Sequence, residues 1–193
     1  MKRANGFTIV ELLIVIVVIG ILAAISIVTY NGLQDRAHDA SRRSGASNIA
    51  KIIGLIATER GADAIGIGSG CGSQGHGTGY YTGVYDPSKR IIDCLVDMGY
   101  PDAAKILDPN GCDVNGPSCH RSESRYMVVS CRKNGRPAAY ALTRIKSEPQ
   151  NASLMSELCD TGSVLGWADD ARTWSGCADA VGNYCINHAV RAY

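Results

Sequence analysis

The chain has 193 residues, a formal net charge of +1 at pH 7 and 19% charged residues. A net charge this close to zero gives no strong field for nucleic acid or an acidic substrate, so no specific nucleic-acid partner is predicted. Aromatic residues make up only 6% of the chain, whereas there are 22 glycines and 8 cysteines. The composition therefore predicts one modest folded domain, rich in loops, rather than a large aromatic core.

An apolar run over residues 12–28 (LLIVIVVIGILAAISIV) follows a single acid, Glu11. The run is somewhat short of the roughly 20 residues that span a bilayer as a helix, and residues 7–10 extend it. A carboxylate at this depth costs about 2.5–3.5 kcal/mol on insertion scales, so Glu11 indicates function and needs a partner. The basic leader, residues 1–6, predicts that the start of the chain lies in the cytoplasm and everything after Tyr30 lies outside.

The basic leader, the Gly6-Phe7 junction and Glu11 before an apolar run together resemble the class III signal of type IV prepilins and pseudopilins. The resemblance covers roughly residues 1 to 35. It implies that a prepilin peptidase of the inner membrane cuts after Gly6 and methylates the new N-terminus at Phe7, while the apolar run stays on the mature protein. It also implies that Glu11 meets the freed amine of Phe7 on a neighbouring subunit, where the pairing fixes register.

The resemblance thus implies a structural subunit of a type IV pilus-like surface filament, with no catalytic residues and no cofactor. Its expected partners are further copies of the chain, the prepilin peptidase, the pilus assembly machinery and the membrane. We expect a single-pass protein of the cytoplasmic membrane with its N-terminus inside, which moves to an extracellular filament on assembly. A pseudopilin of a type II secretion system and a minor or competence pilin are alternatives within the family. A membrane-anchored, disulfide-rich binding domain is the alternative outside it.

Two other interpretations of the apolar run are a cleaved secretory signal and a simple anchor for an unrelated domain. Ala24-Ile25-Ser26 offers the small residues that a secretory signal needs. Neither interpretation explains Gly6-Phe7 and Glu11 together. The chain departs from many pilins at residues 26–28, where those proteins carry a proline, so the resemblance gives less reason to expect local melting of this helix.

The residues after the apolar run predict that the helix continues to about residue 60 with an amphipathic character. One set of isoleucines at helical spacing predicts the seat of a globular head: Ile49, Ile52, Ile53 and Ile56. A second set, expected to pack within a filament, lies about 150° away around the helix: Leu33, Ala37 and Ala40. Gly45 lies between the two sets and is a candidate bend. The predicted parts are a leader (1–6), a membrane and filament-core helix (7–30), its amphipathic continuation (31–60) and an extracellular head (61–193).

The head is predicted to contain one short helix and one β-hairpin. The glycine-rich residues 61–83 predict an irregular connection, and residues 91–98 predict a helix that Gly99-Tyr100-Pro101 ends. Two β-rich runs, residues 124–131 and 138–144, flank Asn134-Gly135 and predict a hairpin. Because a lone hairpin is unstable, we expect it to pack on the isoleucine face of the helix. The predicted fold class is α+β: a long N-terminal helix with an apolar first half, a small antiparallel sheet and a disulfide-stapled C-terminal region.

All eight cysteines follow residue 70, on the side predicted to lie outside the membrane: Cys71, Cys94, Cys112, Cys119, Cys131, Cys159, Cys177 and Cys185. An even number of cysteines in an oxidising compartment predicts a disulfide framework. The spacing leaves the pairing open, and Cys112/Cys119 and Cys177/Cys185 are two plausible close pairs. Structural zinc is the alternative, although the chain has no Cys-x-x-Cys pair.

Residues 108–116 (DPNGCDVNG) loosely resemble a calcium loop, with four oxygen-bearing candidates: Asp108, Asn110, Asp113 and Asn115. The glycines stand at the wrong offsets and no closing glutamate follows, so a turn is favoured and no metal is predicted. No arrangement of a nucleophile with a base predicts an enzyme. Arg132, Lys133 and Arg136 form the only local basic group, which we interpret as a solvated loop.

Overall fold

A computed structural model describes residues 8–66, 69–72, 79–80, 89–109, 126–145, 147–148, 154–160, 163 and 187–193. Its contacts divide the chain into two units, Met1–Ala37 and His38–Tyr193. Several residues with predicted roles lie outside the described ranges: Gly6, Phe7, Cys112, Cys119, Cys177, Cys185, Asn110, Asp113 and Asn115.

The first element, α1 (Ile9–Arg60), is a helix of 52 residues, as the hydrophobic pattern predicts. In the second unit, Ile49, Ile53 and Ile56 are fully buried, which confirms that this face of the helix seats the head. Ile52 packs at the margin of the same core. The second predicted set, Leu33, Ala37 and Ala40, is exposed.

In the described part of the chain, four strands form one antiparallel sheet in the order β1-β2-β3-β4. They are β1 (Gly79–Tyr80), β2 (Tyr126–Lys133), β3 (Arg136–Thr143) and β4 (His188–Arg191). The predicted hairpin is confirmed as β2 and β3, with Lys133 opposite Arg136 beside the turn. Asn134 and Gly135 have φ values of 53° and 75°. Two positive φ angles are typical of a two-residue hairpin turn, whose twist matches that of the strands. Because this turn uses only two residues, both strands extend into residues that the sequence predicts as loop.

Each face of the hairpin packs against a different layer. Tyr126, Val128, Ala139 and Ala141 belong to the core that also contains the buried isoleucines of α1. Met127, Val129, Tyr140 and Leu142 form a second cluster with Cys159 and Leu158, at the end of α3 (Leu154–Leu158). The hairpin is therefore buried on both faces.

Gly45 provides a close approach between α1 and the sheet. A Cβ atom at this position would lie 2.2 Å from the hydroxyl oxygen of Tyr126. That hydroxyl donates to the carbonyl of Ser41, one turn earlier, over 3.4 Å. The helix runs on through Gly45, which the sequence offers as a candidate bend, and the missing side chain makes room for the tyrosine.

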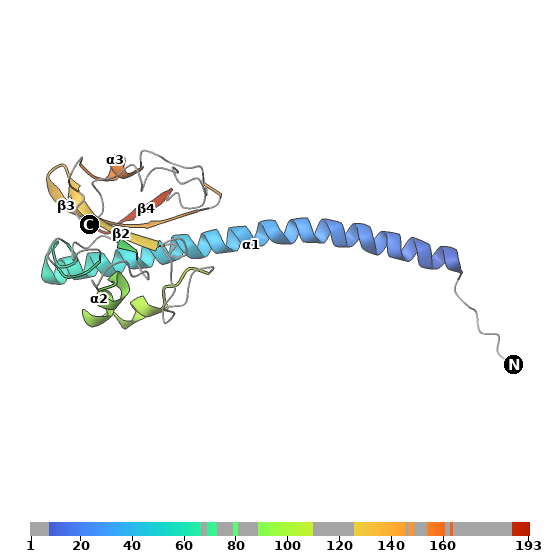
Figure 1. The fold of residues 1–193 in the computed structure, drawn as a ribbon, viewed down its shortest axis with the longest axis horizontal. Coiled ribbons are helices and arrows are strands. Elements are labelled where there is room, and N and C mark those ends of the chain that lie inside the picture. The colour runs from blue at the N-terminus through green and yellow to red at the C-terminus, as the bar shows by residue number, and fades with distance from the viewer. Residues whose placement is uncertain are drawn as a thin grey trace. The chain divides into compact units, whose positions relative to one another are not determined.

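A short helical layer completes the head, and Figure 1 shows it across the C-terminal part of α1 from the sheet. It contains α2 (Ile91–Asp97) and the 3₁₀ helix η2 (Pro101–Lys105), so the predicted short helix and its stop signal are confirmed. The Cys71–Cys94 disulfide ties the preceding loop to α2. Four elements within the described residues are not predicted from the sequence: β1 inside the glycine-rich connection, η2, α3 (Leu154–Leu158) and β4 near residue 190.

Candidate functional site

The first part of α1 has no polar face. Residues Ile9–Ser26 are long and apolar enough to cross a membrane, with a mean hydropathy of 3.0, and none of this stretch is buried within the chain. The large aliphatic side chains from Leu12 to Leu22 are between 47% and 59% exposed. Aliphatic surface on every side of a helix requires an apolar environment supplied from outside the chain, either lipid or other protein.

Thr8 and Glu11 form a reciprocal pair where this helix begins. The backbone N–H of Thr8 donates to Oε2 of Glu11 over 2.8 Å, and the Thr8 hydroxyl donates to the same oxygen over 2.6 Å. In return the backbone N–H of Glu11 donates to the Thr8 hydroxyl oxygen over 3.3 Å. The carbonyl of Thr8 accepts the first helical bond, from Leu12. This arrangement is a capping box, which satisfies donors that a helix N-terminus otherwise leaves without partners.

From the sequence we expect a partner for Glu11 on a neighbouring subunit. That expectation misses Thr8, a partner three residues away in the same chain. A threonine followed three residues later by a glutamate, Thr8-Ile-Val-Glu11, is the usual signal of a capping box. That signal is masked here because the glutamate stands inside a stretch that reads as a membrane span. The carboxylate is thus already hydrogen-bonded in the single chain.

Ser26, at the other end of the apolar stretch, is turned back onto the helix. Its hydroxyl donates to the carbonyl of Leu22 over 2.8 Å. This bond satisfies the one hydroxyl in Ile9–Ser26 without a partner helix. The helix continues past the position where many pilins carry a proline.

The second unit begins with a buried ion cluster on α1. The Nε of Arg42 donates to Oδ2 of Asp108 over 2.7 Å, and its NH1 donates to Oδ1 of Asp39 over 3.4 Å. The other oxygen of Asp39 accepts from the backbone N–H of Ser147 over 2.9 Å. All three charged side chains are at most 8% exposed. Burial alone lowers the pKa of the Arg42 guanidinium, but the hydrogen bond and charge of Asp108, with the charge of Asp39, raise it on balance.

Of the four residues that loosely resemble calcium ligands in the sequence, only Asp108 lies within the described ranges. Both carboxylate oxygens of Asp108 accept hydrogen bonds from Arg42. Within the described ranges the carboxylate therefore serves to attach the segment after η2 to α1.

A disulfide and an aspartate clasp the end of the hairpin. Cys131 in β2 is bonded to Cys159, which places Asp160 beside the turn. The carboxylate of Asp160 accepts the backbone N–H groups of Asn134 and Gly135, each over 2.9 Å. These bonds, first from Gly135 and then from Asn134, lower the pKa of the Asp160 carboxyl.

Two of the three predicted basic residues donate into the chain itself. Arg132 donates to the carbonyl of Gly135, and Lys133 donates to the carbonyl of Glu157. Part of their hydrogen-bonding capacity is therefore used in holding the turn and the end of α3 together.

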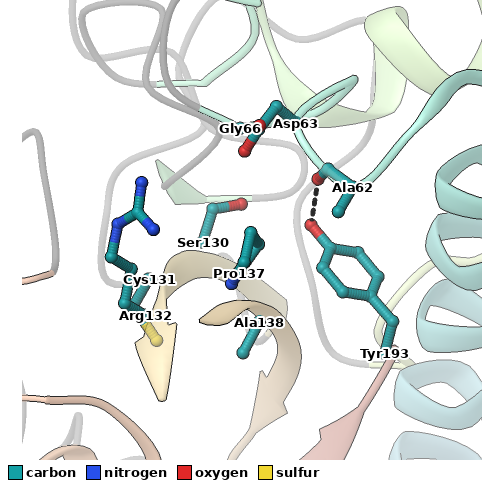
Figure 2. Close-up of a pocket in the computed structure, with 9 residues that line it drawn as sticks. All are labelled: Ala62, Asp63, Gly66, Ser130, Cys131, Arg132, Pro137, Ala138 and Tyr193. Atoms are coloured by element: carbon teal, nitrogen blue, oxygen red, sulfur yellow. Dashed lines mark hydrogen bonds between the residues drawn. The ribbon is translucent and has the colours of Figure 1, made fainter. Parts of the chain in front are cut away.

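A small pocket lies between the turn after α1 and the part of the hairpin next to its Asn134-Gly135 turn. It encloses about 20 Å³, which is room for about one water molecule. Figure 2 shows Tyr193 at one side of it, with its hydroxyl donating to the carbonyl of Ala62. Burial, and then the charge of Asp63, raise the pKa of Tyr193 to about 12. The pocket is too small for an organic substrate.

The cysteines that the structure describes are paired at long range. Cys71 is bonded to Cys94 and Cys131 to Cys159, at sequence separations of 23 and 28. The disulfide framework is thus present for these four cysteines, and the sequence had left the pairing open. Both close pairs that the spacing suggested, Cys112/Cys119 and Cys177/Cys185, lie outside the described ranges. Within those ranges no three His, Cys, Asp or Glu side chains gather as a metal site.

Comparison with known proteins bears on the same N-terminal stretch. The family described as "Prokaryotic N-terminal methylation motif" matches residues 1–27. A protein named "Fimbrial protein" from Dichelobacter nodosus is 34% identical over 119 residues, which cover 58% of this chain and 64% of that protein. The "Type IV major fimbrial protein FimA" of the same organism is 36% identical over 111 residues, which cover 57% and 64%.

A third relative is the "Type IV narrow pilus major component PilA5" of Thermus thermophilus. It is 54% identical over 57 residues, which cover 30% of this chain and 49% of that protein. The matches therefore span less than two thirds of the length of each of these relatives. No solved structure matches the chain significantly.

Proposed function

The methylation motif and the fimbrial relatives support the type IV pilin family, and we propose on that basis that this chain is the structural subunit of a type IV pilus-like filament. The observation that carries the proposal is the exposed apolar stretch Ile9–Ser26, none of which is buried within the chain. Lipid covers this surface before assembly, and copies of the same helix cover it in the filament. The subunit itself catalyses no reaction.

Processing frees the group that assembly uses. In this proposal the prepilin peptidase cuts after Gly6 and methylates Phe7, so the mature chain begins with a charged amine close to Thr8. The leader stays on the cytoplasmic side and the head faces outward, as the basic residues before the apolar stretch indicate. The amine of Phe7 on one copy pairs with Glu11 of a neighbour in the filament core, where an unpaired charge is costly.

The processing step can be tested by replacing Gly6 with leucine. The leader should then remain attached, and the protein should stay in the membrane fraction and be absent from filaments. A mature N-terminus near Ile27 in the unaltered protein would instead identify a cleaved secretory signal and overturn the proposal.

The pairing can be tested at Glu11 with two variants. Glu11→Ala should still be cut after Gly6 and should insert at least as well, because it removes an insertion cost of about 2.5–3.5 kcal/mol. Its assembly should fail or slow sharply. Glu11→Gln is the matched variant, because glutamine can keep the capping box while it removes the charge. Normal filament yield from Glu11→Gln would refute the charge pairing, whereas a low yield from both variants supports it.

Yield relative to other filament components distinguishes the family alternatives. A major subunit should be the dominant band of sheared surface material. Presence only in trace amounts would favour a minor pilin or a pseudopilin of a secretion system.

A further inference from the structure

The turn of the hairpin consists of an asparagine followed by a glycine, Asn134-Gly135, and both residues are exposed. In such a pair the backbone nitrogen of the glycine can attack Cγ of the asparagine side chain. A bond forms between nitrogen and Cγ, the nitrogen loses its proton, and the side-chain amide takes up a proton and leaves as ammonia. Water then opens the resulting succinimide ring to aspartate or isoaspartate. Because glycine has no side chain to obstruct the attacking nitrogen, Asn134 is chemically a candidate for deamidation.

The native turn holds the reacting atoms apart. The φ of Asn134 is 53°, in the left-handed region, where ψ lies between about +30° and +60°. In that conformation the nitrogen of Gly135 and the Cβ of Asn134 lie on opposite sides of the bond between Cα and the carbonyl carbon, whereas the ring requires them on the same side. Deamidation can therefore proceed only from an opened turn, and its rate follows the population of that open state.

Asp160 holds the turn closed from outside the hairpin. Its Oδ1 accepts the N–H of Asn134 and its Oδ2 accepts the N–H of Gly135, each over 2.9 Å. The second bond occupies the proton that the attacking nitrogen has to lose. The backbone of Asp160 is itself fixed, because its N–H donates to the carbonyl of Arg132 over 2.7 Å and the preceding residue is bonded to Cys131. The turn N–H groups lower the pKa of the Asp160 carboxyl, so it is a poor base for removing that proton.

We propose that Asn134 is a latent deamidation site and that the Asp160 carboxylate is the group that protects it. The protection belongs to the folded head alone and does not depend on the proposed function. Deamidation is one-way here, because aspartate or isoaspartate at position 134 places a second carboxylate beside Asp160, and like charges this close repel. Isoaspartate also adds a backbone atom to a two-residue turn, which disturbs the register of β2 and β3.

One variant opens the turn without altering the hairpin sequence. Asp160→Ala removes both bonds to the turn. Glu157→Ala is the matched control, because it removes an exposed carboxylate from the same segment and keeps the backbone carbonyl that accepts from Lys133. A second reference lies within the chain, since Asn31-Gly32 is the same dipeptide inside α1. Near-ultraviolet circular dichroism of each variant verifies that the head is folded.

The experiment incubates the full-length chain in detergent and mildly alkaline buffer, and follows the deamidated fraction at each site by peptide mapping and mass spectrometry. A synthetic peptide of residues 132–137 (RKNGRP) gives the rate of the open sequence. We expect Asn134 to deamidate far more slowly in the unaltered chain than in the peptide. Asp160→Ala should raise the rate at Asn134 about tenfold, the size expected for one hydrogen bond to a charged group. It should leave the rate at Asn31 unchanged.

Three results would overturn the protection. Equal rates in the unaltered chain and the peptide would show that the folded turn gives none. An unchanged or lower rate in Asp160→Ala would show that the carboxylate is neutral or promotes the attack. An equal rise at Asn31, or in Glu157→Ala, would show general loosening of the chain in place of a specific clasp. None of these results bears on filament assembly, so the proposed function is tested separately.

Discussion

The two parts of α1 carry similar aliphatic side chains, but these side chains are exposed in the first part and buried on one face in the second. Ile16, in the first unit, is 58% exposed, whereas Ile53, in the second, is fully buried. The sequence explains the difference, because the later isoleucines occupy one face of the helix and the earlier residues surround it completely. An amphipathic helix can be covered by its own head, but a helix that is apolar all round has to be covered by something else.

The charged side chains of the two units also differ, in how far along the sequence their partners lie. In the first unit Glu11 is held locally, by a residue one turn away. In the second unit Arg42 joins residues that are far apart in sequence, since Asp108 lies 66 positions further along the chain. The first arrangement leaves the helix free to change surroundings, and the second fixes the head on the helix.

The strongest challenge to this comparison is Arg42→Ala, which leaves Asp39 and Asp108 buried without their cation. Removing one partner of a buried pair costs about 3–5 kcal/mol, so the head should lose most of its stability. The neighbouring Arg43→Ala is the control, because its bond to Glu148 is half exposed and contributes about 0–1 kcal/mol. The measurement is chemical unfolding of the full-length chain in detergent, followed by near-ultraviolet circular dichroism. Equal stability losses from the two variants would contradict the structural role of the cluster.

The same substitution in both halves sharpens the comparison. Ile53→Ala should lower the free energy of unfolding of the head by about 2–5 kcal/mol, because it leaves a cavity in the core. Ile16→Ala removes the same atoms where nothing in the chain packs on them, and it should leave head unfolding unchanged. A similar loss from Ile16→Ala in the same unfolding assay would mean that the apolar stretch folds back onto the head.

Replacing Gly45 or Gly32 with alanine compares the two units again, with a smaller expected effect on the stability of the head. Gly45→Ala places a Cβ 2.2 Å from the Tyr126 hydroxyl oxygen, so either the ring or the helix has to move. Overpacking of this kind costs about 1–3 kcal/mol. Gly32→Ala meets nothing within 4 Å and should not alter the head. Thermal unfolding of the two variants side by side gives the test, and an undiminished melting temperature for Gly45→Ala would show that the close approach carries no constraint.

The smallest expected effect depends on pH. The turn N–H groups lower the pKa of Asp160 below its ordinary value of 3.8, so the clasp contributes stability above that value and loses it as the pH falls through the lower native pKa. An NMR titration should show the amide signals of Asn134 and Gly135 moving together in this acidic range. Asp160→Asn should abolish the movement. Signals that titrate at or above the ordinary value in the unaltered protein would argue against the two hydrogen bonds.

The elements that the sequence predicts correctly are those with a local physical signal. The period of Ile49, Ile53 and Ile56 predicts the buried face of α1, and Asn134-Gly135 predicts the hairpin because both residues tolerate positive φ. The strand β4 has no comparable signal. It has four residues, and its place beside β3 depends on long-range pairing.

The sequence predicts less of the site than of the fold. Glu11 is conspicuous because an acid in an apolar helix is costly, but Thr8 is an ordinary residue until its distance from Glu11 is seen. The disulfide pairs and the partner of Arg42 depend on which loops meet in the folded head. Residue spacing carries no information about such contacts.

The central claim is that the apolar half of α1 stays on the mature protein and is covered by other copies of the chain. Mass spectrometry of intact subunits from sheared surface filaments tests it most directly. The account predicts that this chain is present as a species that begins at a methylated Phe7 and retains the whole apolar stretch. Filaments that lack the chain, or a mature species that begins after Ser26, would contradict it.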